Sequence, residues 1–122
     1  MFTTLVDKVK SDLLISKFKN MFVVSDYNMN NQQKSKLLWC NLSCKGKIVP
    51  INEFVEIPID MCSEVYFYNE RDNKMYQNKF LQVAQYIKEL EPWEDIDCEI
   101  FDDTMTWFIS ITHEDFCIVY GL

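Results

Sequence analysis

Glycine, proline and histidine are scarce in this chain. Its 122 residues include two glycines, three prolines and a single histidine, His113. With so little glycine and proline, a long flexible linker is not expected. Hydrophobic residues make up 48% of the sequence, enough for a core without disulfide or metal staples, and they exclude a disordered chain. We therefore expect one domain over residues 1–122.

Signals for export and membrane insertion are also missing. The N-terminus has no basic region followed by an apolar core and a small-residue cleavage site. No apolar run approaches the roughly 18 residues that a membrane-spanning helix needs. The five cysteines are an odd number and form no C-x-x-C pair, which favours reduced and mostly buried thiols. These features predict a cytoplasmic protein.

Basic residues are absent from the last third of the chain. Residues 1–88 hold 12 basic and 9 acidic side chains, whereas residues 89–122 hold 10 acidic and no basic ones. A field of this sign repels nucleic-acid phosphates and favours basic protein partners. Acidic surfaces also keep proteins soluble, so the net charge of −7 alone does not identify a partner.

Two segments have the apolar periodicity of helices. Residues 2–19 carry apolar side chains at intervals of three and four, with Thr3 or Thr4 as the predicted cap. The apolar side chains there are Phe2, Leu5, Val6, Val9, Leu13 and Phe18. Residues 76–90 form the second predicted helix, which should end near Leu90 because Pro92 follows.

The segments between these helices are predicted to be largely extended. Residues 21–27 and 61–68 favour strands, and residues 51–59 favour an edge strand or an extended loop because they contain a proline. The periodicity of residues 34–44 does not distinguish a buried strand from a helix face, but the turn that follows favours a strand. A turn at Gly46 with positive φ would lead into a returning strand at residues 48–49.

The last third is predicted to form three antiparallel strands. They cover residues 96–101, 106–112 and 116–120, with short turns between them, and the middle one should be central in the sheet. In the first, Ile96, Cys98 and Ile100 alternate with acidic residues, so Asp97 and Glu99 are expected on an exposed face. The sequence therefore predicts an α+β fold with two main helices packed on a mainly antiparallel sheet that ends in a three-stranded C-terminal meander.

No catalytic or metal-binding motif emerges from the residues. His113 stands beside Glu114 and Asp115, but neighbouring strand residues point to opposite faces, which disfavours a zinc site. A catalytic thiol needs a lowered pKa, whereas the acidic surroundings of Cys98 would raise its pKa and Cys117 lies in an apolar strand. Paired carboxylates such as Asp102 with Asp103 lack the order of a calcium loop. No enzyme, metal or cofactor is predicted.

A protein-binding surface accounts better for the acidic and aromatic residues of the last third. Carboxylates on a sheet face and its turns can occupy the Arg and Lys groups with which a nuclease holds phosphates. Trp107 favours the core, whereas the loop residue Trp93 is as compatible with a binding role as with packing. The predicted partner-binding residues are Trp93, Glu94, Asp95, Asp97, Glu99, Asp102, Asp103 and His113.

The same third resembles small immunity proteins of bacterial polymorphic-toxin systems, including contact-dependent growth inhibition. The resemblance is carried, over about 30 of the 122 residues, by Pro92-Trp93-Glu94-Asp95, Ile100-Phe101-Asp102, Trp107 and Ile111-Thr112-His113-Glu114. It implies a cytoplasmic antidote that binds a toxin domain, often a basic nuclease, and blocks its active site without catalysis. A monomer is favoured.

Three alternatives stay open at this point. The first is a phage- or plasmid-encoded inhibitor of a host nucleic-acid enzyme, which would use the same charge complementarity against another target. The second is a small hydrolase that uses cysteine and histidine. The third is a subunit or scaffold module, which would expose a large apolar patch.

Overall fold

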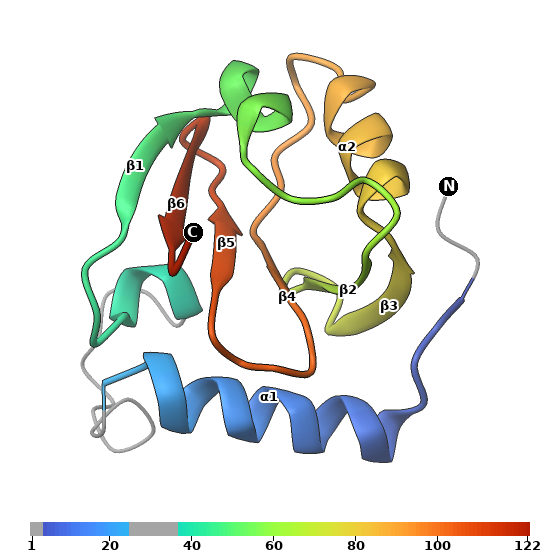
Figure 1. The fold of residues 1–122 in the computed structure, drawn as a ribbon, viewed down its shortest axis with the longest axis vertical. Coiled ribbons are helices and arrows are strands. Elements are labelled where there is room, and N and C mark those ends of the chain that lie inside the picture. Colours follow the sequence, from blue (N-terminus) through green and yellow to red (C-terminus); the bar gives the residue numbers. More distant parts are fainter. Residues whose placement is uncertain (1–3, 25–36) are drawn as a thin grey trace.

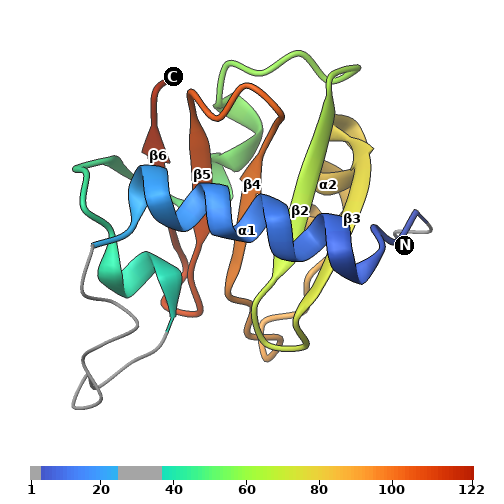
Figure 2. The same cartoon turned by 90° about the horizontal axis from the view of Figure 1, so that it is seen from below.

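The computed structural model describes residues 4–24 and 37–122 as one antiparallel six-stranded sheet with helices on both faces (Figures 1 and 2). The strands are β1 (Lys47–Pro50), β2 (Glu64–Asn69), β3 (Lys74–Lys79), β4 (Cys98–Phe101), β5 (Phe108–Ile111) and β6 (Phe116–Tyr120). They lie in the order β1-β6-β5-β4-β2-β3. The α-helices are α1 (Lys8–Phe22) and α2 (Phe80–Lys88), and the 3-10 helices are η1 (Leu38–Asn41) and η2 (Ile51–Glu56). The predicted α+β class is confirmed, including the C-terminal meander of β4, β5 and β6 with β5 inside the sheet.

Helix α1 crosses one face of the sheet (Figure 2). It begins after Asp7, whose Oδ1 accepts a hydrogen bond of 2.9 Å from the amide of Lys10. The prediction of a helix over residues 2–19 is therefore wrong at its start, because Asp7 rather than Thr4 provides the cap, and at its end, because α1 continues to Phe22. Residues 2 and 3 lie outside the described residues. The residues before it line the edge of β3 instead, where Val6 N donates to Met75 O at 2.8 Å.

The sequence predicted the buried face of α1 only in part. Its buried residues are Ser11, Leu14, Phe18 and Phe22, which recur at intervals of three and four. Their rings and side chains pack on Tyr66, Tyr68, Phe101, Phe108 and Ile118 of the sheet. Leu5, Val9 and Leu13 were expected in this core and are exposed instead.

A matched pair of adjacent leucines tests this orientation of α1. Leu14 is 6% exposed and Leu13 is 61% exposed. Leu14→Ala should lower the free energy of unfolding by about 2–5 kcal/mol because it leaves a cavity. Leu13→Ala should change it by less than about 0.5 kcal/mol. Urea unfolding of both variants measures the difference, and the reverse ranking would mean that α1 presents its other face to the sheet.

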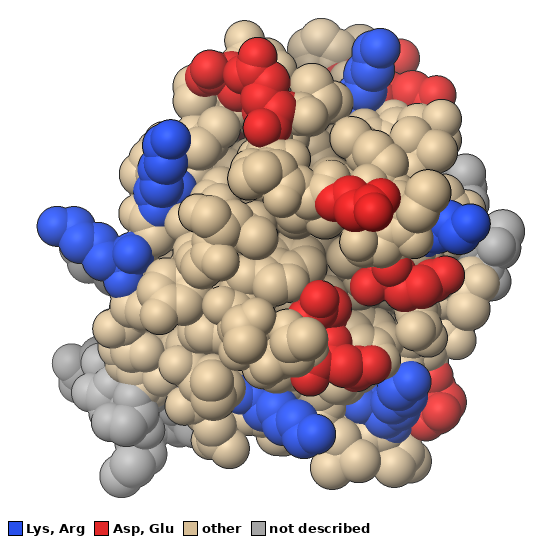
Figure 3. Space-filling model, in the orientation of Figure 1, with Lys and Arg blue, Asp and Glu red and all other residues tan. Residues whose placement is uncertain are grey.

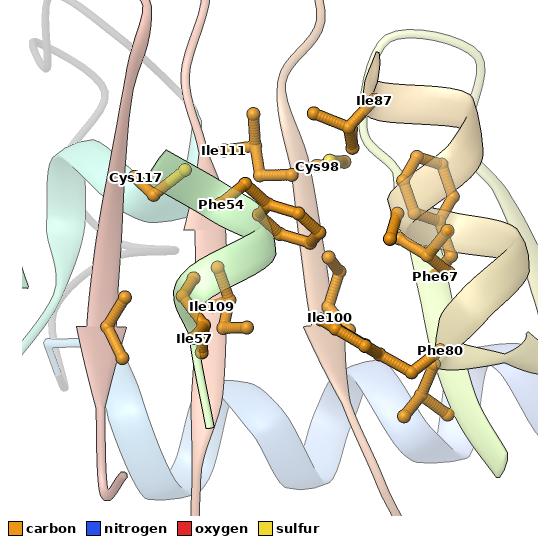
Figure 4. Packing of buried hydrophobic residues seen from close by; sticks show 14 of the residues in the cluster. Phe54, Ile57, Phe67, Phe80, Ile87, Cys98, Ile100, Ile109, Ile111 and Cys117 are labelled. Carbon is orange, nitrogen blue, oxygen red and sulfur yellow. The ribbon is translucent and has the colours of Figure 1, made fainter. Parts of the chain in front are cut away.

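Helices α2 and η2 cover the opposite face of the sheet (Figure 4). The rings of Phe54 from η2 and Phe80 from α2 stack there with centroids 5.3 Å apart. Cys98 and Cys117 belong to the same cluster, as expected of core thiols. Burial raises the pKa of Cys98 well above its ordinary value and that of Cys117 to about 12, so neither is a reactive thiolate at neutral pH.

Several local predictions between the two α-helices are wrong. Residues 74–79 form β3, although a helix was expected from residue 76, because pairing with β2 overrides the helical pattern. Residues 51–56 form η2, which turns Phe54 into the core. Residues 38–41 form η1, while residues 34–36 of that undecided segment lie outside the described residues. Of the strand expected at residues 21–27, the first two residues complete α1 and residues 25–27 lie outside the described residues.

Gly46 is required for space rather than for positive φ. It leads into β1, but β1 pairs with β6 rather than returning along residues 37–44, and Gly46 does not have the expected positive φ. A Cβ at this position would stand 2.5 Å from Ile118 Cγ2 and 3.0 Å from the carbonyl oxygen of Val119. The absence of a side chain lets the chain approach β6 closely enough for β1 to pair with it.

Candidate functional site

The carboxylate of Asp97 forms hydrogen bonds with several polar groups at one end of the sheet. Asp97 directly precedes β4 and is 1% exposed. Its Oδ1 accepts hydrogen bonds from Trp39 Nε1 at 2.8 Å, from His113 Nδ1 at 2.8 Å and from the His113 amide at 3.2 Å. Its Oδ2 accepts one from Arg71 Nε at 2.9 Å. Asp97 thus joins η1, the β2–β3 turn and the β5–β6 turn.

These contacts determine the charge of Asp97. Burial by itself would raise its pKa, but the hydrogen bonds from His113, Trp39 and Arg71 outweigh burial, and the pKa is lowered. An ionised carboxylate can only accept hydrogen bonds, so Nδ1 of His113 is the donor. The imidazole is held further by an edge-on contact with the Trp39 ring, with centroids 5.7 Å apart.

A pair of carboxyl groups, those of Glu70 and Glu99, lies beside this network. Glu99 is fully buried on the α1 side of β4, paired across the sheet with Tyr68 and Ser110. None of the described residues donates a hydrogen bond to its carboxyl oxygens. The Glu70 carboxylate accepts hydrogen bonds from the amide of Leu38 at 2.9 and 3.1 Å.

Both carboxyl groups have a raised tendency to hold a proton. Burial raises the pKa of Glu99 well above its ordinary value, and the neighbouring Glu70 carboxylate raises it further. Burial also raises the pKa of Glu70, to about 7. Burial therefore favours the neutral form of Glu99, whose carboxyl oxygens have no hydrogen-bond partner among the described residues.

An apolar groove adjoins the Asp97 network. It encloses about 670 Å³ between η2, α2, the segment that leads into β4, and the β5–β6 turn. Its apolar walls come from Pro50, Ile51, Phe54, Val55, Ala84, Ile87, Leu90, Pro92 and Ile96. Its charged lining consists of Lys88, Glu91, Glu94 and Asp115, and His113 also lines it. His113 is thus the residue through which the polar network reaches the groove.

The expected exposed acidic face on the C-terminal strands is wrong. Asp97 and Glu99 are buried because both faces of β4 are covered. Cys98 and Ile100 pack under α2 and η2, whereas Phe101 packs under α1. A sheet with helices on both sides leaves no alternating solvent face. These two acidic residues cannot touch a partner directly in this structure.

The acidic turn between β4 and β5 lies at the other end of the sheet from Asp97 (Figure 1). There Asp102 Oδ2 accepts a hydrogen bond of 3.0 Å from Trp107 Nε1. Asp103 accepts one of 2.9 Å from the Tyr66 hydroxyl. Trp107 is buried, in agreement with the core role favoured for it. Asp102 and Asp103 therefore belong to a different part of the surface from the groove.

The remaining predicted residues lie beside the groove. Trp93, Glu94 and Asp95 are exposed in the loop before β4, and Trp93 is 77% exposed. On the face shown in Figure 3, acidic side chains form separate groups with basic and uncharged surface between them. The eight predicted residues thus divide into a groove-side group, two buried carboxyls and a distant turn.

Sequence reasoning missed Trp39 and Arg71 of the Asp97 network, and it missed Glu70 of the neighbouring carboxyl pair. Arg71 is the only arginine of the chain, and a lone arginine in a polar turn is a usable signal because its planar fork suits a buried carboxylate. Trp39 and Glu70 gave no such signal. Their contacts with residues 97 and 99 depend on how distant segments meet.

The groove offers few side chains that could take part in catalysis. An imidazole held by a carboxylate can act as a base. Of the described residues that line the groove, none is a cysteine and the one hydroxyl is that of Thr112, which donates to Phe116 O at 3.1 Å. The described part of the chain holds no group of three His, Cys, Asp or Glu side chains suited to a metal ion. Among its helices, none has both the length and the apolar character to cross a lipid bilayer.

Comparison with family models, curated proteins and solved structures found no match for this chain. The fold and the groove, rather than kinship, are therefore the basis for a functional assignment.

Proposed function

We propose that this protein is a bacterial immunity protein that binds a basic toxin domain, a nuclease, in the cytoplasm and blocks its active site. The observation that carries the proposal is the indole of Trp93, which is 77% exposed on the loop beside the groove. Glu91, Glu94 and Asp95 flank it within four residues of the chain and are all exposed. The proposal includes no cofactor and no turnover.

The exposed indole of Trp93 and the carboxylates around it have properties that favour binding to a basic protein. Exposing an indole to water is unfavourable unless a partner covers it, and tryptophan is among the residues that contribute most to protein interfaces. Carboxylates around it attract the Arg and Lys groups of a nuclease and speed association. Of the eight residues predicted from the sequence, the proposed contact therefore retains Trp93, Glu94, Asp95 and His113, and Asp97 contributes indirectly by holding the imidazole.

Co-purification tests the proposal. The toxin candidate is the protein encoded immediately upstream of this gene, and we expect a one-to-one, salt-sensitive complex in which the toxin loses its activity. Trp93→Ala should raise the Kd of that complex about 10–100-fold. Ile48→Ala is the matched control because Ile48 is an exposed apolar residue of the edge strand β1 and is remote in sequence from the loop. An equal Kd for wild type and Trp93→Ala would refute the assignment of the contact.

The Asp97–His113 pair supports a second candidate, a small hydrolase. The pair keeps the imidazole oriented at the groove wall, as a general base requires. His113→Ala would abolish hydrolysis but would leave an inhibitor largely able to bind. A substrate screen with both proteins separates the two, because turnover lost in His113→Ala would favour the enzyme.

A further inference from the structure

The groove between η2 and α2 has walls that fit an apolar side chain. Phe54 and Ile87 form its buried floor, and Val55 of η2 stands at its wall with 51% of its surface exposed. Its volume of about 670 Å³ falls in the range of sites that bind ligands, which is about 300–1,000 Å³. Water forms few hydrogen bonds with such apolar walls. Binding of an apolar group that displaces this water is therefore favourable in free energy.

The charges at the groove opening are mainly negative. Glu91, Glu94 and Asp115 provide three carboxylates, whereas Lys88 provides the one amine among the described residues that line it. Neither Glu91 nor Asp115 takes part in an ion pair among the described residues. This arrangement repels an acidic ligand and attracts a cationic one.

We infer that the groove binds a segment of the partner protein in which an apolar side chain is flanked by lysine or arginine. The apolar side chain enters between η2 and α2, and the flanking cations meet Glu91, Glu94 and Asp115. The inference deepens the proposed function and rests on it for the identity of the partner. It identifies the contacting part of the toxin as a basic segment with an apolar anchor.

Short labelled peptides test the recognition chemistry directly. The probe alternates arginine and leucine, and its binding is read by fluorescence anisotropy at low and high salt. A peptide of arginine and glutamine retains the charge without the apolar anchor, and a peptide of glutamate and leucine reverses the charge. We expect both comparison peptides to bind at least about 10-fold more weakly than the probe. Equal binding of either one, or no binding of the probe, would overturn the inference.

Two pairs of variants test whether the probe peptide binds in the groove. Val55→Arg places a cation in the groove wall and should weaken binding about 10–100-fold. Its control is Leu81→Arg, since Leu81 is 45% exposed on α2 and does not line the groove. Glu91→Lys should weaken binding mainly at low salt, and its control is Glu53→Lys on η2, outside this groove. Unfolding curves confirm that the variants fold, and equal effects of a variant and its control would overturn the location.

The same variants separate this inference from the proposed function. If the upstream protein is bound and neutralised by wild type and equally by Val55→Arg, the immunity role stands and the groove inference fails. If no toxin is bound but the probe still discriminates Val55→Arg from Leu81→Arg, the groove inference stands and the immunity role fails. Self-association of the protein that Val55→Arg abolishes would assign the groove to a second copy of the chain and overturn the inference.

Discussion

Asp97→Ala is expected to lower the free energy of unfolding by about 1.5–3 kcal/mol at pH 7. The substitution removes the acceptor that Trp39, His113 and Arg71 share, and these partly exposed donors lose their charged partner. It also removes the side-chain contacts by which Asp97 joins η1 to the two turns. Urea unfolding with a common slope for both proteins measures the loss.

Asp95→Ala is the matched control, two residues earlier in the chain. Asp95 is exposed, so this variant should stay within about 0.5 kcal/mol of wild type. The folded pKa of Asp97 is lowered, so its contribution is present above its ordinary pKa and is lost as the pH falls through the folded pKa. A loss below about 1 kcal/mol in Asp97→Ala at pH 7 would mean that the network contributes little to stability.

Glu99→Gln is expected to raise the free energy of unfolding at pH 8 by about 1–3 kcal/mol and to change it little at pH 5. In wild type, the folded pKa values of Glu70 and Glu99 are raised. The folded protein therefore holds protons that the unfolded chain has already released. Between the ordinary pKa of about 4.5 and about 7 for Glu70, wild-type stability falls as the pH rises. The loss approaches about 1.4 kcal/mol per pH unit for each group.

Glutamine removes one of these two titrations. Its amide is close in size to a protonated carboxyl group, and it stays neutral at every pH. Ser110→Ala is the control, because Ser110 is the buried polar neighbour of Glu99 across the sheet and does not titrate in this range. Its effect should be the same at both pH values. Parallel pH profiles for wild type and Glu99→Gln would show that the pKa of Glu99 is not raised in the folded protein.

Periodicity in the sequence was sufficient where a segment's own pattern decides its structure. It predicted α2 near its observed end and the order of β4, β5 and β6, because these strands are neighbours along the chain and are joined by short turns. It failed for β3, whose helical pattern gives way to pairing with β2. It also failed for Leu13 and Leu14, since a helix with apolar residues on two sides does not show which side meets the sheet.

The candidate site was predictable only in part. The exposed segment with Trp93 follows from Pro92 and the polar residues around it, and His113 was singled out because it is the only histidine. The buried positions of Asp97 and Glu99 were not predictable, because alternation with apolar residues is the same whether or not a helix covers the second face. Trp39 and Arg71 meet Asp97 across 58 and 26 residues of chain, a separation that no local pattern records.

The position of β6 in the sheet has a consequence for synthesis on the ribosome. β6 is the last strand of the sheet along the chain, yet it lies between β1 and β5, with Lys47 of β1 opposite Val119 of β6. During synthesis β1 is therefore made before β6, and it has no strand partner until nearly all the remaining described chain has been made. Until then the nascent chain exposes Ile48 and Val49 as an unpaired edge, which is the kind of surface that chaperones protect.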